Sequence, residues 1–149
     1  MDLESLYQEI ILDHYKHPRS TATIPDPLAS AYHVNPTCGD EVTVQVALDG
    51  SGGLSLGIEG QGCSISQASA SVLSELATGR SPGDVEPIRL AFIEMMHAKG
   101  EGTPDEEVLG DGVAFAGVAK YPARVKCALL PWMALRDAEI QAGIIQGEE

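Results

Sequence analysis

The stretch DEVTVQVALDGSGGLSLGIEG, residues 40–60, predicts the centre of the fold because its apolar side chains recur at every second position. This period places them on one face of a β-strand. The alternation runs over residues 42–48, stops at the turn DGSGG, and resumes over residues 54–58. We therefore expect a β-hairpin with one buried face.

Helical spacing of apolar residues is found on both sides of this hairpin. Residues 3–17 carry apolar side chains three and four positions apart, and Pro18 follows them, which indicates a helix that ends there. Further helices are expected from about Cys63 to Gly79, within residues 81–100 and within residues 121–143.

Two connecting segments carry other signals. Residues 21–37 contain three prolines and many small side chains, so an extended segment without regular structure is expected. Thr103 and Glu106 have the spacing of a helix-capping box, which predicts a short helical turn within residues 103–110. The length of 149 residues predicts a single domain over residues 1–149.

The charge of the chain argues against some classes of partner. The net charge is −13 with nine Lys and Arg, whereas nucleic-acid binding depends on clustered basic side chains. No run of 18 apolar residues is present, and the acidic, amphipathic N-terminus is unlike a signal peptide. We expect no nucleic-acid partner, no membrane partner, and a cytoplasmic location in which the three cysteines stay reduced.

Cys38 lies in the polar turn NPTCGD, residues 35–40, which offers no apolar stripe for a packed thiol. Gly39 permits a turn that would bring the Cys38 sulfur and the Asp40 carboxylate to one side. A thiolate and a carboxylate so placed repel each other unless a cation lies between them. An isolated cytosolic cysteine is more often a packed residue, but this context favours binding or reaction.

The other two cysteines are expected on helices. Cys63 follows GQG and opens a helix, where free backbone N–H groups and the helix dipole favour a thiolate. Cys127 is expected on the last helix, facing away from its apolar packing stripe. That stripe consists of Val125, Ala128, Leu129 and Trp132.

Three cysteines and one carboxylate form a ligand set that zinc accepts in a tetrahedral site. The four candidate ligands are Cys38, Asp40, Cys63 and Cys127. The spacing of the cysteines differs from that of a CxxC zinc ribbon, so the prediction depends on the context of each residue. His14 and His17 have no cysteine nearby in the sequence, and we expect them at the surface or at an interface.

Four motifs resemble those of the U-type iron-sulfur cluster assembly proteins, the family of IscU, SufU and the NifU amino-terminal domain. The motifs are LYQEIILDHYKHPR (6–19), NPTCGDEV (35–42), GQGCSISQASAS (60–71) and YPARVKCALL (121–130). The SufU branch is the most similar for two reasons. The sequence GCSIS around the second cysteine resembles SufU, and the segment between Cys63 and Cys127 is longer than in IscU. The resemblance implies an α+β fold in which a small antiparallel β-sheet carries helices on one face, with the four candidate ligands at one end.

The resemblance also implies a function, that of a zinc-dependent sulfurtransferase or sulfur carrier of the SUF type. Cys38 would accept persulfide sulfur from a cysteine desulfurase of the SufS type, with Asp40 as its functional partner. Sulfur would then pass to a downstream SUF cluster-assembly scaffold, and a homodimer is compatible with this role. Lys126 stands where the IscU type has a histidine, and KYPARVK replaces the LPPVK chaperone-docking motif of that type.

Three other functions stay open at this point. The same four residues could bind iron or scaffold a [2Fe-2S] cluster. Zinc could instead only stabilise an interaction module without chemistry. A cysteine hydrolase is less favoured, because no histidine lies in a motif that pairs with a cysteine. Whether the chain is an enzyme is therefore not decided by the sequence.

Overall fold

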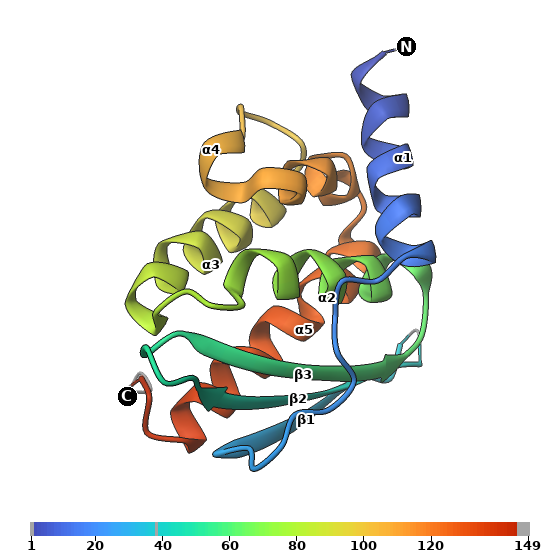
Figure 1. Cartoon of the computed structure of the whole chain (residues 1–149). Helices are drawn as coiled ribbons and strands as arrows, with labels where there is room; N and C mark the ends of the chain where they lie inside the picture. The colour runs from blue at the N-terminus through green and yellow to red at the C-terminus, as the bar shows by residue number, and fades with distance from the viewer. Residues whose placement is uncertain (1, 38, 146–149) are drawn as a thin grey trace.

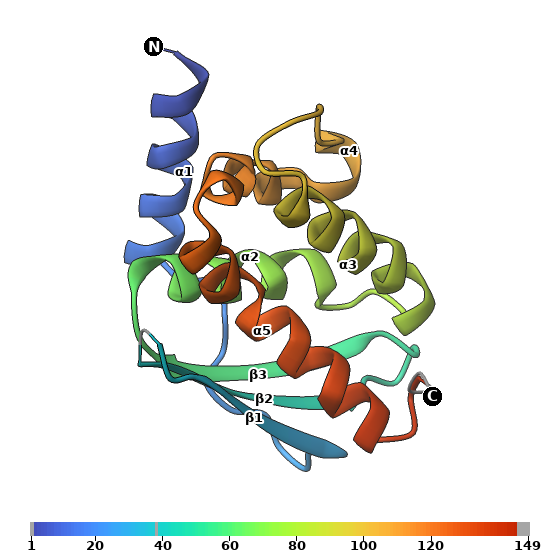
Figure 2. The same ribbon diagram turned by 180° about the vertical axis from the view of Figure 1, so that it is seen from behind.

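The computed structural model of the chain describes residues 2–37 and 39–145. Three antiparallel strands form one sheet in the order β1-β2-β3. They are β1 (Ala29–Asn35), β2 (Asp40–Leu48) and β3 (Leu54–Gln61). Helices cover one face of this sheet (Figure 1 and Figure 2). The predicted α+β class, with helices on one face of a small antiparallel sheet, is confirmed.

The predicted hairpin is confirmed as β2 and β3. Val44 faces Ile58 across the two strands, and both side chains are buried. The Asp49 carboxylate orders the turn, because its Oδ1 accepts the backbone N–H groups of Ser51 at 2.8 Å and Gly53 at 2.9 Å. The period-two pattern therefore predicted both the strands and the buried face.

Strand β1 contradicts the expectation that residues 21–37 lack regular structure. Its residues pair in antiparallel register with β2, from Ala29 opposite Val46 to Asn35 opposite Asp40. The inward side of β1 holds small and polar side chains, whereas Tyr32 is 58% exposed on the outward side. The strand was missed because this distribution reverses the usual apolar alternation of a strand at a sheet edge.

The helical elements follow the predicted order. They are α1 (Leu3–Lys16), α2 (Ser64–Ala77), α3 (Pro82–His97), α4 (Glu106–Leu109), the 3₁₀ segments η1 (Gly110–Ala116) and η2 (Val118–Lys120), and α5 (Pro122–Gln141). The predicted Thr103 cap is wrong, because the Asp105 carboxylate accepts the Glu107 N–H at 2.9 Å. Within residues 2–37 and 39–145, no helix has the length and apolar content needed to span a membrane.

Helix α5 is buried around more of its circumference than the sequence indicated. Cys127 is 1% exposed and Ala134 is completely buried, whereas Val125 and Leu129 are only half-buried. The predicted stripe does pack against the core, but the expectation that Cys127 faces away from the packed surface is wrong. The physical reason is that α5 packs against both the sheet and α2 (Figure 2), so a single stripe cannot describe its buried surface.

Small residues let α2 approach α5 closely. The Ser69 hydroxyl donates to the backbone carbonyl of Ala128 at 2.5 Å and accepts the indole N–H of Trp132 at 3.1 Å. The Trp132 ring stacks on Phe92 of α3, with centroids 4.3 Å apart. These contacts fix α2 relative to α5, and thereby the helices on which Cys63 and Cys127 lie.

Candidate metal centre

Asp40 begins β2 and is completely buried. Its Oδ1 accepts the backbone N–H of Cys63 at 2.7 Å, which joins the start of the sheet to the start of α2. Gly62, at φ +147°, makes this approach possible, because a Cβ there would lie 2.7 Å from the Asp40 Cγ. The glycine before Cys63 is therefore required by the carboxylate that it faces.

Cys63 is the N-cap residue of α2 and is half-buried. Its Sγ lies 3.3 Å from Oδ2 of Asp40, so one carboxylate oxygen meets the backbone and the other meets the sulfur. The Cys63 carbonyl accepts the Ser66 hydroxyl at 3.1 Å. The prediction that Cys63 opens a helix is confirmed.

Cys127 enters the same site from α5. Its thiol donates to the carbonyl of Ala123 at 3.6 Å, and its Sγ accepts the side-chain N–H of Asn35 at 4.0 Å. The sulfur is therefore held between the first turn of α5 and the end of β1. This position is internal, which is why Cys127 is buried although it is not part of the predicted apolar stripe.

The structure thus brings together three of the four candidate ligands. One ligand atom from each of Asp40, Cys63 and Cys127 lies within 4.8 Å of the others. Cys38, the fourth candidate, lies outside the described residues. A buried carboxylate beside two thiols is unfavourable if all three ionise without a cation. Sulfur and carboxylate donors at these separations fit zinc, and they also fit iron.

Asn35 is a site residue that the sequence analysis missed. Its carbonyl accepts the Gly39 N–H at 2.9 Å, and its side-chain oxygen accepts the Thr37 N–H at 3.3 Å. Its side-chain nitrogen faces Cys127, as described above. Asn35 therefore holds Thr37 and Gly39, the two residues next to Cys38 in the sequence. The sequence did indicate Asn35 through its place in the motif NPTCGD. Its pairing with Asp40 could not be predicted, because strand β1 was not expected.

His14 is not at the surface, contrary to the expectation from the sequence. It is completely buried, with Nδ1 2.7 Å from the Ser71 hydroxyl and Nε2 2.7 Å from Oδ2 of Asp111. The Ser71 hydroxyl also accepts the Arg19 backbone N–H at 2.8 Å. This network joins the end of α1 to α2 and η1. It gives the histidine a structural role, whereas His17 is exposed as expected.

Comparison with known proteins identifies the family. Residues 6–128 match the NifU-like N-terminal domain. The chain belongs to this family. This result confirms the resemblance carried by the four sequence motifs.

Two relatives and one solved structure are similar to this chain over most of their length. The chain is 40% identical to the zinc-dependent sulfurtransferase SufU of Bacillus subtilis, over 90% of this chain and 89% of that protein. It is 35% identical to the iron-sulfur cluster assembly scaffold protein IscU of Streptococcus pyogenes, over 91% of this chain and 84% of that protein. An N-terminal NifU-like protein of Brucella abortus superimposes with a TM-score of 0.81 at 25% identity, over 95% and 96% of the two chains.

Asp40→Asn provides the sharpest test of the carboxylate in this NifU-like site. The amide oxygen can still accept the Cys63 N–H, so the fold should be retained, whereas Asp40→Ala would leave that buried donor unpaired at a cost of about 1–3 kcal/mol. We expect Asp40→Asn to keep only part of the bound zinc, because a neutral amide oxygen is a weaker ligand than a carboxylate. Metal analysis measures this effect, and a wild-type zinc content would show that Asp40 is not a ligand.

Proposed function

We propose that this chain is a zinc-dependent sulfur carrier of iron-sulfur cluster assembly, and that Cys38 accepts persulfide sulfur from a cysteine desulfurase. The observation that carries the proposal is the convergence of Asp40, Cys63 and Cys127 within 4.8 Å. Cys38 is two residues from Asp40 in the sequence, which makes it the natural fourth ligand. The 40% identity to a zinc-dependent sulfurtransferase supports the same function.

The assignment of roles rests on the positions of Cys63 and Cys127 in the structure and on the sequence around Cys38. Cys63 is fixed by the start of α2, and Cys127 is fixed inside the fold by α5 and Asn35. The sequence predicts Cys38 in a polar turn, and its neighbour Gly39 has φ +74°. A ligand in a turn can leave a metal without moving a helix, so Cys38 is the thiolate suited to react.

The transfer step balances as a thiol-disulfide exchange. The Cys38 thiolate attacks the outer sulfur of the persulfide on the desulfurase cysteine. A sulfur-sulfur bond forms at Cys38, the bond inside the donor persulfide breaks, and the desulfurase cysteine leaves as a thiolate. Zinc, when bound, would keep Cys38 deprotonated and protected before this step.

The experiment that tests the function locates the transferred sulfur. The zinc-loaded chain is incubated with a cysteine desulfurase, pyridoxal phosphate and cysteine, then alkylated and analysed by peptide mass spectrometry. We expect the added sulfur on the peptide that contains Cys38, and Cys38→Ser should abolish stimulation of the desulfurase. Sulfur found mainly on Cys63 or Cys127 would overturn the assignment.

A second candidate function is the assembly of a [2Fe-2S] cluster on the same residues. It is favoured by the 35% identity to a scaffold protein of the IscU type and by the fact that thiolates are cluster ligands. Anaerobic reconstitution with iron and sulfide separates the two functions. A coloured, stable cluster retained after desalting would favour the scaffold, whereas retained zinc and no colour would favour the carrier.

A further inference from the structure

A second group of potential metal ligands lies away from the thiols. One donor atom from each of His14, Glu75 and Asp111 lies within 4.8 Å of the others. These residues belong to α1, α2 and η1, respectively. Glu75 follows Cys63 by twelve residues along α2, which corresponds to about 18 Å of helix. The group is therefore separate from the candidate metal centre.

His14 supplies the nitrogen donor of this group from inside the fold. Its side chain is completely buried, whereas the side chains of Glu75 and Asp111 are 43% and 42% exposed. Its Nε2 lies 2.7 Å from Oδ2 of Asp111 and 3.9 Å from Oε1 of Glu75. Two donors bound to one ion at about 2.1 Å lie at most about 4.2 Å apart. Both carboxylates are therefore within reach of an ion bound to Nε2, and their exposure leaves that ion open to water.

The other ring nitrogen of His14 is held in a way that suits metal binding. Nδ1 lies 2.7 Å from the Ser71 hydroxyl, which also accepts the backbone N–H of Arg19 at 2.8 Å. With the proton on Nδ1, the ring donates to Ser71 and its Nε2 lone pair faces the carboxylates. Metal-binding histidines have this arrangement, in which a hydrogen bond from the second nitrogen fixes the ring. With the proton on Nε2, the ring would instead donate to Asp111.

The charges around His14 favour a cation. Carboxylates of Asp13, Glu75 and Asp111 gather here, and the Arg19 guanidinium lies 2.7 Å from Asp13 and 3.7 Å from Glu75. With a neutral imidazole, three negative charges and one positive charge leave −2. A divalent ion would neutralise this charge, whereas a proton on His14 would remove only half of it.

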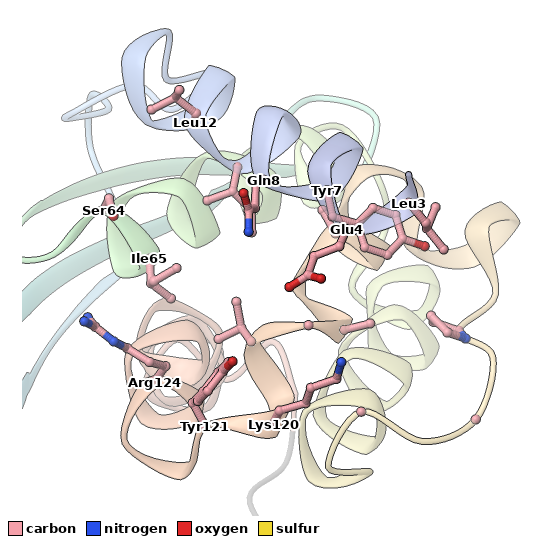
Figure 3. Close-up of a pocket in the computed structure, with 18 of the residues that line it drawn as sticks. Leu3, Glu4, Tyr7, Gln8, Leu12, Ser64, Ile65, Lys120, Tyr121 and Arg124 are labelled. Atoms are coloured by element: carbon pink, nitrogen blue, oxygen red, sulfur yellow. The ribbon is translucent and has the colours of Figure 1, made fainter. Parts of the chain in front are cut away.

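The group also lies outside the large groove beside α1. Figure 3 shows Glu4 of α1 facing Lys120 across that groove, so charges of opposite sign already meet there. The α1 lining runs from Leu3 to Leu12 and does not reach His14, and Glu4 carries the one carboxylate among the described lining residues. The donors suited to a metal ion are therefore found at the C-terminal end of α1 and not in the groove.

We propose that His14, Glu75 and Asp111 bind a divalent first-row transition-metal ion, with water in the remaining positions. Imidazole suits zinc and iron, and carboxylates and water suit manganese. The bound ion would join the end of α1 to α2 and η1. The inference does not depend on the proposed sulfur-carrier function, because none of the candidate thiol ligands takes part.

Manganese is the probe for this site, because thiolate ligands select zinc over manganese. The zinc-loaded chain is freed of excess metal and titrated with Mn²⁺ at neutral pH, and free Mn²⁺ is measured by electron paramagnetic resonance. We expect about one Mn²⁺ per chain. Glu75→Gln and Asp111→Asn should each weaken its binding about tenfold or more, since even outer residues of a metal site change affinity about 10–100-fold. Glu59→Gln and Asp84→Asn replace exposed carboxylates outside the group and should leave Kd nearly unchanged.

Pulsed electron paramagnetic resonance tests the histidine without changing a buried residue. Mn²⁺ bound to His14 should show coupling to an imidazole nitrogen, and this coupling should disappear in Asp111→Asn. Mn²⁺ should also raise the Tm of the wild type more than that of Glu75→Gln, because an ion that binds only the folded chain stabilises it. These substitutions replace half-exposed carboxylates by amides of the same shape, so the Tm without Mn²⁺ should change little.

Each outcome bears on the proposal. Loss of binding in Glu75→Gln and Asp111→Asn but not in the two controls, together with nitrogen coupling in the wild type, would support it. Binding that is equally weak in all variants, or that lacks nitrogen coupling, would reflect general attraction of Mn²⁺ to an acidic chain and overturn it. Wild-type binding in Glu75→Gln or in Asp111→Asn would also overturn it. No desulfurase is used, so a failure here is distinct from a failure of the sulfur-carrier function.

Discussion

We expect the wild type to hold about one zinc ion in a closed tetrahedral site, and Cys127→Ser to lose most of it. The serine hydroxyl is a much poorer zinc ligand than a thiolate. Cys127 is buried and held by Ala123 and Asn35, so another side chain cannot replace it without moving α5. Cys63→Ser should have the same effect, because Cys63 is fixed at the start of α2.

Metal analysis of protein purified without added iron measures this effect. Ser66→Ala is the matched control, because its hydroxyl bonds to the Cys63 carbonyl and lies 4.0 Å from the Cys63 sulfur, but serine is not among the side chains zinc prefers. It should retain nearly all the zinc. Removal of zinc with a chelator should also lower the Tm of the wild type, since metal binding contributes to folding free energy. Full zinc occupancy in both cysteine variants would exclude the site described above.

The hairpin and most helices could be predicted because local pattern and final environment agree there. Alternating valines in residues 42–48 are buried on one side, and Pro82 and Gly79 lie at helix boundaries. Strand β1 could not be predicted in this way. Its structure depends on pairing with β2, and pairing between distant segments is not recorded in the local pattern of either one.

The candidate metal ligands could be predicted from the sequence, but the residues that position them could not. The contexts of Cys63, Cys127 and Asp40 indicated ligands, and the structure brings those three together. Asn35 and Gly62 act through contacts across strands and across the start of α2. The buried network of His14 has the same origin, because its partners lie 57 and 97 residues away in the sequence.

The largest expected change in stability comes from a buried ion pair that does not include any of the candidate metal ligands. Arg89 of α3 and Glu139 of α5 are both completely buried, and Nη2 of Arg89 lies 2.8 Å from Oε1 of Glu139. Arg89 Nε and Nη1 and Glu139 Oε2 are buried without a hydrogen-bond partner in the described structure. Burial raises the pKa of the Glu139 carboxyl above its ordinary value of 4.5, and Arg89 opposes this increase.

Arg89→Met should therefore destabilise the fold by about 3–5 kcal/mol at neutral pH, because it leaves a buried carboxyl without its cation. With Arg89 absent, the pKa of Glu139 in the folded state should rise further. A carboxyl whose pKa is raised by folding favours the native state when protonated, so stability is lost as pH increases above 4.5 through the folded-state pKa. The decrease in Tm should consequently be larger at pH 8 than at pH 5.

Two further variants separate the ion pair from a general effect of mutation. Arg19→Met removes the half-exposed pair with Asp13, and such surface pairs contribute only about 0–1 kcal/mol. Arg89→Met combined with Glu139→Leu removes both buried charges and should recover much of the stability lost in the single variant. Thermal denaturation of the zinc-loaded proteins measures all three changes. Two outcomes would contradict this account: a loss of stability in Arg89→Met that does not depend on pH, or a double variant no more stable than Arg89→Met alone. Only an uncompensated buried carboxyl predicts both the direction of the pH dependence and its removal by Glu139→Leu.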